Sequence, residues 1–269
     1  MDNFVDERDF KLLENDKYTF FVLKRIMGGE CKLLLTDHSR LIICFSGEPF
    51  PVWIWTADDA TPEEMEKAFS LCDEHGFLDG SHTFNVKYEL SNYFIKKAAE
   101  KGENYAILTN MFAYDCPALS DNPAPTDGGI YQCQPDDIDE YVEFSDLFHK
   151  ATGIDQQSRE SYRKRGEQAI KDGRTYFWKN DEGKNVASCN YNTEGELACI
   201  GLVFTKPEYR RHHYAENLVY QVTKKGLNAG FMPMLYTDAD YTASNACYEK
   251  IGYILRGKLC TVGKPNREI

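Results

Sequence analysis

The amino-acid sequence predicts an α/β protein of two domains, each with a mostly antiparallel mixed sheet flanked by helices. The chain has 269 residues, which exceeds the usual size of a single domain. Near its middle, residues 116–128 are rich in proline and glycine and have no periodic pattern. On both sides of this stretch, short apolar runs alternate with segments of helical spacing. We therefore expect one domain at residues 1–115, a linker at 116–128 and a second domain at 129–269.

The first half begins with helical spacing and continues with three short apolar runs separated by turn residues. Thr61-Pro62 is typical of a helix start, because Thr caps helices and Pro favours the first turn. The expected helices are 10–26, 61–75 and 89–101, and the expected strands are 32–35, 41–45, 52–55, 83–88 and 105–114. The strand Val52–Trp55 belongs to an alternating aromatic run that we interpret as core.

The second half repeats much of this order. The expected strands are 130–133, 175–178, 186–191, 197–205, 232–236 and 253–262, and the expected helices are 135–151, 158–172, 214–226 or 214–230, and 243–251. Two successive hairpins imply antiparallel strands, and the later strand–helix–strand unit implies a parallel pair. The similar order suggests a degenerate duplication, although the two halves show no sequence self-similarity.

The formal net charge is −12, from 31 basic and 43 acidic residues. A negative field repels nucleic acid and anionic membranes, so we expect neither as a partner. It suits cationic substrates such as amines, although surplus carboxylates also simply keep a protein soluble.

The nine cysteines are scattered, odd in number and without a CxxC pair. This pattern favours neither a disulfide framework nor a zinc site, so we expect no metal. The first residues are acidic, unlike a secretory signal, and no apolar run reaches the about 18 residues of a membrane span. These features favour a cytoplasmic protein.

The segment 202–219 has the strongest functional pattern. An apolar strand runs into a bend at Lys206-Pro207, which leads to an amphipathic helix from Tyr214. The first amide groups of a helix have no partner within it and can bind an anion. Arg210, Arg211, His212 and His213 concentrate basic side chains at this bend in an otherwise acidic chain. Such a bend is suited to a polyphosphate cofactor.

Residues 210–215, Arg-Arg-His-His-Tyr-Ala, resemble the acetyl-CoA signature of the GNAT superfamily of N-acetyltransferases, Arg/Gln-x-x-Gly-x-Gly/Ala. A later segment with Asn245, Tyr248 and Gly252-Tyr253 is similar to the closing helix of that family. The resemblance covers roughly residues 129–263 and implies two GNAT-like domains, the first one degenerate. The chain differs from the family pattern at His213, which replaces a glycine, and at Tyr241, which replaces an asparagine.

The resemblance also implies a set of cofactor contacts. The central strand would separate from its neighbour, and the backbone of Val203 and Thr205 would bond the pantetheine arm as an added strand does. Backbone amides and basic side chains of the bend would hold the pyrophosphate, and Asn245 would touch the pantetheine. The predicted cofactor-binding residues are Val203, Thr205, Arg210, Arg211, His212, His213, Tyr214, Ala215 and Asn245. The alternatives are a core strand, a solvated basic bend and a helix-capping or surface asparagine.

Tyr248 is the candidate catalytic residue, because a phenol stays protonated at neutral pH and can protonate a departing CoA thiolate. The alternative is a core tyrosine. No single general base stands out among four carboxylates that flank the central strands, Glu194, Glu196, Asp238 and Asp240. Direct transfer requires no covalent nucleophile, so we interpret Cys199 and Cys247 as core residues.

These inferences predict transfer of an acetyl group from acetyl-CoA to a primary amine of a small molecule or peptide, by a monomer or homodimer. The alternative is a non-catalytic CoA-binding or regulatory module with a degenerate site. The first domain lacks a phosphate-binding bend, because its third strand leads into the acidic stretch 56–60. Loops that contact the acceptor are expected near residues 151–159.

Overall fold

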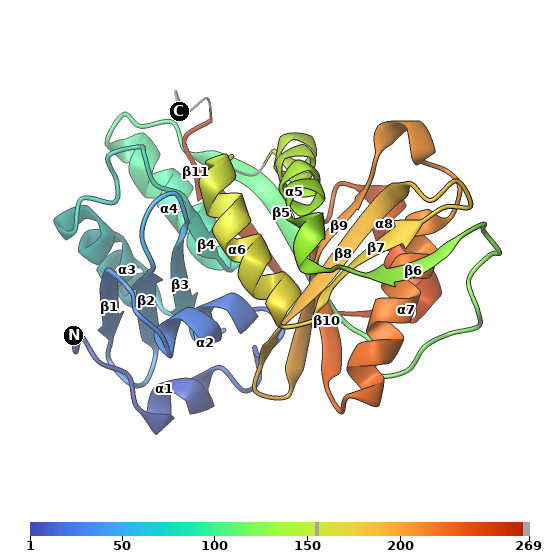
Figure 1. Ribbon diagram of the computed structural model, residues 1–269. Coiled ribbons are helices and arrows are strands. Elements are labelled where there is room, and N and C mark those ends of the chain that lie inside the picture. Colours follow the sequence, from blue (N-terminus) through green and yellow to red (C-terminus); the bar gives the residue numbers. More distant parts are fainter. Residues whose placement is uncertain (154–155, 266–269) are drawn as a thin grey trace. The chain divides into compact units, whose positions relative to one another are not determined.

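A computed structural model describes residues 1–153 and 156–265 of the chain (Figure 1). The chain forms two compact units. Of the described residues, the first contains Met1–Ala113, Thr237–Tyr241 and 256–265, and the second contains 114–153, 156–236 and Thr242–Leu255. This division differs from the boundaries expected at 115 and 129, because most of the last strand belongs to the first unit.

The strands of the first unit follow one another in the order β1-β2-β3-β4-β11-β5. Its helices are α1 (Glu7–Leu12), α2 (Phe21–Met27), α3 (Pro62–Glu74) and α4 (Tyr88–Glu100), and its strands are β1 (Leu33–Thr36), β2 (Leu41–Phe45), β3 (Val52–Thr56), β4 (Phe84–Val86), β5 (Ala106–Asp115) and β11 (Ile254–Gly263). Strands β1, β2 and β3 pair antiparallel, β3 and β4 pair parallel through α3, and β4 pairs antiparallel with β11.

The single helix expected at residues 10–26 is wrong, because α1 ends at Leu12 and α2 begins only at Phe21. The intervening turns carry Asp16, whose carboxylate accepts hydrogen bonds from Trp55 Nε1 and Lys87 Nζ, both at 2.7 Å. These contacts with distant residues hold the chain out of the helix. Local periodicity could not reveal them, since they depend on the folded sheet.

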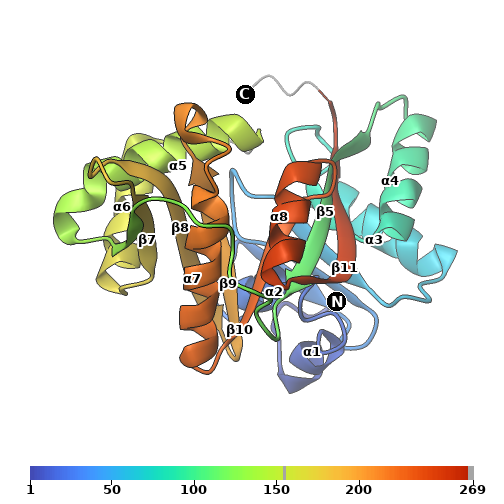
Figure 2. The same cartoon turned by 90° about the vertical axis from the view of Figure 1, so that its right-hand side faces the viewer.

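The strands of the second unit follow one another in the order β10-β9-β8-β7-β6, of which β7 to β10 are labelled in Figure 2. Its strands are β6 (Gly129–Gln132), β7 (Thr175–Lys179), β8 (Asn185–Glu194), β9 (Leu197–Thr205) and β10 (Met232–Asp238), and its helices are α5 (Ile138–Thr152), α6 (Arg159–Lys171), α7 (Tyr214–Asn228) and α8 (Thr242–Ile251). Strands β6 to β9 pair antiparallel, and β9 pairs parallel with β10. The predicted element order and the mixed α/β fold class are confirmed.

Helices α5 and α7 cover opposite faces of this sheet. Phe177 of β7 packs against Phe144 of α5, with ring centroids 5.0 Å apart. Its neighbour Tyr176 instead faces α7, where Lys225 Nζ lies 5.5 Å from the ring centroid. Since successive strand residues point to opposite faces, the two helices lie on different sides. The apolar cluster under α5 and α6 includes Phe204 of β9.

Residues 116–128, which we call the linker, have no regular secondary structure, but they are tied to the second unit at many points. Ser120 N donates to Ile251 O at 2.9 Å, and Asn217 Nδ2 donates to Ala124 O at 2.9 Å. Gly128 ends the linker with φ of 79°, and a Cβ there would lie 1.9 Å from Lys179 O. The linker is therefore a packed part of the second unit.

Replacing Gly128 with alanine tests this packing. We expect Gly128→Ala to lower the free energy of unfolding by more than about 3 kcal/mol, because a left-handed alanine is strained and the Lys179 backbone must also move. The matched control is Gly183→Ala, which also has a positive φ (76°) but has no heavy atom within 4 Å of the added Cβ. The control is expected to lose about 1–2 kcal/mol. Equal losses in urea unfolding would contradict a closely packed linker.

Candidate functional site

Strand β9 presents an unpaired backbone edge. Its parallel pairing with β10 extends from Leu197 with Met232 to Ile200 with Leu235, and within the described residues it goes no further. Lys206 N bonds Val186 O on the opposite side, at 3.0 Å. Because an antiparallel ladder alternates its bonds, the backbone of Thr205 and, two residues earlier, of Val203 points away from β8. Apart from the carbonyl of Thr205, which accepts from Arg210 Nε at 3.4 Å, these groups are available to an extended ligand.

A β-bulge lies at the start of this edge. Cys189 of β8 is opposed by two residues of β9, because the register shifts between Ser188 and Asn190. Leu202, one of the two, has a positive φ of 50°, and its carbonyl accepts a 2.8 Å hydrogen bond from Ser188 Oγ. A bulge bends and twists its strand, which accounts for the early end of pairing with β10. Nothing in the residue pattern indicated this bulge.

The bend that follows β9 leaves the N-terminus of α7 uncapped. Its N-cap residue, His213, makes no side-chain capping bond. Within the described part of the chain, the backbone N–H groups of residues 211–216 donate to no protein acceptor. The equivalent helix of the first unit, α3, is closed by a capping box, in which Thr61 Oγ1 accepts from Glu64 N and Glu64 accepts from Thr61 N. The N-terminus of α7 therefore has backbone amides that are free to bind an anion, whereas the N-terminus of α3 is capped.

Two residues of this bend adopt the left-handed conformation without being glycine. Arg211 has φ of 67° and His213 has φ of 62°. When left-handed residues alternate with residues of negative φ, their successive N–H groups point into one concavity. This arrangement is the geometry of an anion-binding nest. Each such residue costs about 1–2 kcal/mol, so the surrounding contacts must maintain this shape.

The side chains of the bend are basic and exposed. Arg210 Nε contacts Thr205 O at 3.4 Å, and its guanidinium lies 5.7 Å from the Phe204 ring centroid. Among the described residues, no carboxylate forms an ion pair with Arg210 or Arg211. His213 Nδ1 lies 2.9 Å from Glu216 Oε2, which orients the imidazole. The sequence analysis missed Glu216, although its spacing of three residues from His213 was visible.

Helix α8 places Asn245 and Tyr248 on one buried face, together with Ile251. The Tyr248 ring makes an edge contact with Tyr253, with centroids 5.9 Å apart. Helix α8 packs against α7, so both belong to the same side of the second unit. The structure thus places all ten predicted site residues in the second unit: Val203, Thr205, Arg210, Arg211, His212, His213, Tyr214 and Ala215 around β9 and the bend, and Asn245 and Tyr248 on α8.

Cys247 is unsuited to nucleophilic chemistry. Burial raises the pKa of Cys247 to about 11, so its thiol stays protonated at neutral pH.

The candidate bases divide between the units, with Glu194 and Glu196 in the second and Asp238 and Asp240 in the first. The acceptor loop expected at 151–159 includes residues 154 and 155, which lie outside the described residues.

The linker contacts the bend directly, which the sequence analysis did not anticipate. Thr126 Oγ1 donates to His212 O at 2.7 Å, and Tyr214 Oη donates to Asp127 Oδ1 at 2.6 Å. The bond to Asp127 raises the pKa of Tyr214 to about 12 and lowers that of Asp127. No local pattern connects these residues, because 86 and 87 positions separate the partners.

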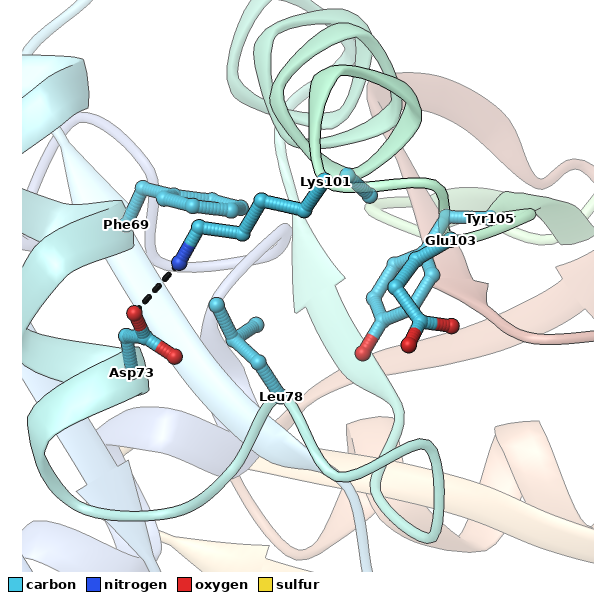
Figure 3. A pocket seen from close by; sticks show the side chains of 7 residues that line it. Phe69, Asp73, Leu78, Lys101, Glu103 and Tyr105 are labelled. Carbon is cyan, nitrogen blue, oxygen red and sulfur yellow. Dashed lines mark hydrogen bonds and ion pairs between the residues drawn. The ribbon is translucent and has the colours of Figure 1, made fainter.

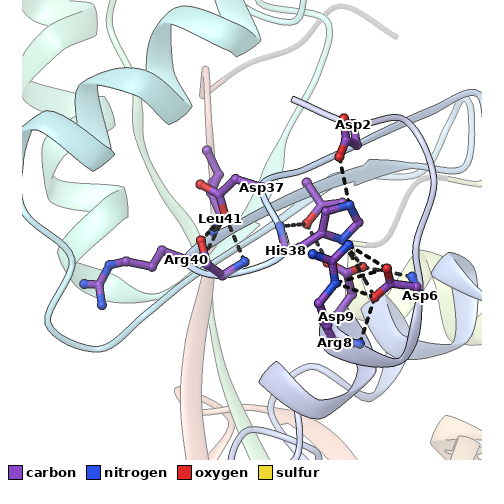
Figure 4. A network of polar contacts seen from close by, with 10 residues as sticks. Asp2, Asp6, Arg8, Asp9, Asp37, His38, Arg40 and Leu41 are labelled. Atoms are coloured by element: carbon purple, nitrogen blue, oxygen red, sulfur yellow. Dashed lines mark hydrogen bonds and ion pairs between the residues drawn. The ribbon is translucent and has the colours of Figure 1, made fainter.

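The first unit contains a small pocket and a buried polar cluster, and the proposed site uses neither. A pocket between α3 and α4 is lined by Phe69, Asp73, Leu78, Ala98, Lys101, Glu103 and Tyr105, and its ammonium group, from Lys101, pairs with Asp73 (Figure 3). In a second cluster, the buried Asp9 carboxylate contacts His38 Nδ1 at 2.7 Å and accepts from Thr36 and the Asp6 backbone (Figure 4). These bonds tie the N-terminal helix to β1.

None of the described helices combines the length and the apolar character needed to cross a bilayer.

Comparison with known proteins identifies the family of the second half. The sequence profile of the acetyltransferase (GNAT) family matches residues 141–253. No curated protein matches the chain. A GCN5-related N-acetyltransferase from Sphaerobacter thermophilus superposes with a TM-score of 0.67 at 13% identity, covering 93% of this chain and 87% of that one.

Two further solved structures cover nearly the whole chain. A GNAT-family acetyltransferase from Colwellia psychrerythraea has a TM-score of 0.60 at 11% identity, covering 98% of this chain and 99% of that one. A GCN5-related N-acetyltransferase from Kribbella flavida has a TM-score of 0.61 at 13% identity, covering 94% and 97%. At these identities the likeness shows the fold, and it extends over both halves. Residues 141–253 therefore form a domain of the acetyltransferase (GNAT) family, which implies acyl transfer from an acyl-CoA.

Proposed function

We propose that the protein transfers an acetyl group from acetyl-CoA directly to a primary amine. The observation that carries this proposal is the uncapped N-terminus of α7, which follows the unpaired edge of β9. Together they offer amide donors for a diphosphate and an open strand edge for an amide-containing arm. These are the two recognition elements that acetyl-CoA requires, and the family match supports the assignment.

In the proposed mechanism, bound acetyl-CoA supplies an activated thioester. The amides from Arg211 to Glu216 hold the diphosphate, and Arg210 and Arg211 add positive charge. The backbone of Val203 and Thr205 orients the arm, with Asn245 beside it. Holding the amine next to the thioester provides much of the rate enhancement. The neutral amine attacks the carbonyl carbon, and the C–S bond breaks as Tyr248 donates its hydroxyl proton to the departing sulfur. The proton that the amine nitrogen loses returns to the Tyr248 phenolate, directly or through water, so the enzyme regains its starting state.

Cofactor binding is tested by isothermal titration of the full chain with CoA and acetyl-CoA. We expect binding of one molecule per chain, weakened at high salt because charge holds the phosphates. Absence of any binding heat with the folded protein at two temperatures would contradict the proposed cofactor.

The role of Tyr248 is tested by Tyr248→Phe. If the phenol protonates the leaving thiolate, turnover falls by about 10²–10⁴-fold while CoA affinity is unchanged. Turnover is followed as free thiol released from acetyl-CoA with a panel of primary amines.

The matched control is Tyr253→Phe, whose hydroxyl is buried against Thr223 Oγ1 at 2.7 Å. The control should lose stability and keep its turnover. Full activity of Tyr248→Phe would exclude the acid role, and binding without turnover in the parent would favour a regulatory CoA-binding module.

The left-handed His213 is tested by comparing His213→Gly with His213→Ala. Both variants lose the contact with Glu216, so their difference reports the backbone conformation alone. Glycine adopts φ of 62° without strain, so we expect His213→Gly to be more stable than His213→Ala by about 1 kcal/mol. His213→Gly should also bind CoA at least as tightly as His213→Ala. Chemical unfolding and calorimetry measure the two quantities, and a more stable alanine variant would contradict this conformation.

A further inference from the structure

The linker makes bonds to the proposed cofactor site that a mere connection between domains does not need. It runs along α7 toward the N-terminus of that helix. Asn122 Oδ1 accepts from Tyr220 at 3.1 Å, Ala124 O accepts from Asn217, and Thr126 and Asp127 then reach His212 and Tyr214. The last two contacts lie at the bend whose amides are free.

The bond from Thr126 controls the direction of one of these amides. Thr126 Oγ1 donates to the carbonyl of His212 at 2.7 Å. The peptide group between His212 and His213 is planar and trans, so its N–H points opposite to its carbonyl. Holding the carbonyl against the linker therefore directs the His213 N–H away from it. His212 itself lies between two left-handed residues, Arg211 and His213, where the backbone alone would not keep this orientation.

Asp127 fixes the first residue of the helix. Its Oδ1 accepts the Tyr214 hydroxyl at 2.6 Å, and its Oδ2 accepts the backbone N–H of Asp181 at 3.1 Å. Its own carbonyl accepts from Trp178 Nε1 at 2.8 Å. Trp178 belongs to β7 and Asp181 to the turn that follows, so Asp127 connects the bend to the sheet. The Tyr214 side chain is 6% exposed, and the His212 ring stacks on it at 5.6 Å between centroids.

We propose that Thr126 and Asp127 are positioning residues of the cofactor site, which hold the bend 210–213 in its nest conformation before the cofactor binds. This inference rests on the proposed function, because it assigns the bend to the cofactor diphosphate. The linker residues themselves donate nothing to the phosphates. Their effect is to order the donors in advance, so that binding does not incur the entropy of ordering the bend.

The first test removes single hydroxyl groups and measures CoA affinity by calorimetry. Thr126→Val and Tyr214→Phe should each weaken CoA binding about fivefold or more, which corresponds to about 1 kcal/mol. Thr126→Ser keeps the hydroxyl and should restore binding to within about twofold of the parent. In steady-state assays the KM for acetyl-CoA should rise in the two weakened variants, while kcat changes little.

The matched control is Tyr220→Phe. Tyr220 lies on the same helix, has a similarly buried side chain (7% exposed against 6%) and donates to the linker at Asn122. This bond is remote from the bend, so the control should lose some stability and retain its CoA affinity. If Tyr214→Phe and Tyr220→Phe affect CoA binding equally, the linker acts only through stability and the proposal is overturned. Tighter binding by Thr126→Val would overturn it as well.

A second measurement needs no cofactor. Arg210 and Arg211 are exposed in the bend, and trypsin cleaves after either residue once the bend opens locally. In the protein without cofactor, cleavage at these two positions should be faster in Thr126→Val and Tyr214→Phe than in the parent and in Tyr220→Phe. Mass spectrometry of the fragments identifies the site. If the parent fails to bind CoA, the proposed function fails, whereas unchanged cleavage rates would refute the positioning role independently.

Discussion

The candidate site depends on a helix that begins without a cap. The first N–H groups of α7 have no protein acceptor within the described residues, and two non-glycine residues before it are left-handed. Both features are unfavourable for the isolated chain, since unsatisfied amides and positive φ each cost free energy. Under the proposed function, the cofactor diphosphate accepts hydrogen bonds from these amides and offsets part of this cost. The proposed diphosphate site, the role of β9 and the inference about the linker all follow from this one arrangement.

The two halves of the chain show how a small local difference separates two similar topologies. Each half leads from three antiparallel strands through a crossover helix to a parallel strand, β3-α3-β4 in one and β9-α7-β10 in the other. In the first half, Thr61 and Glu64 close the helix N-terminus with a reciprocal capping box, and Asp58 and Asp59 precede it. In the second half the same position is open and basic. A capped helix start beside carboxylates is unsuited to a phosphate, which is why the proposed function assigns the cofactor to the second half.

The path of the backbone makes the two halves interdependent. Strand β11 is the last of the chain, yet it pairs with β4 and lies between β4 and β5 in the first unit. The linker, which precedes the second half, is bonded along α7 and reaches the bend. Neither unit is therefore a contiguous segment, and dividing the chain at residue 115 or 129 would separate β11 from β4, with which it pairs.

The sequence by itself predicted most of the helices and strands, and it indicated the bend before α7 as the expected anion site. Periodicity placed β2 and β9 at their observed bounds, and a proline bend before an amphipathic helix marked the open amides, because these signals come from neighbouring residues. The tertiary structure decided the rest. The break between α1 and α2 depends on Asp16 meeting Trp55 and Lys87, the bulge at Leu202 depends on its register with β8, and the contact of Thr126 with His212 joins residues 86 positions apart. Contacts of that kind leave no periodic trace, since each depends on where distant strands and helices come to lie.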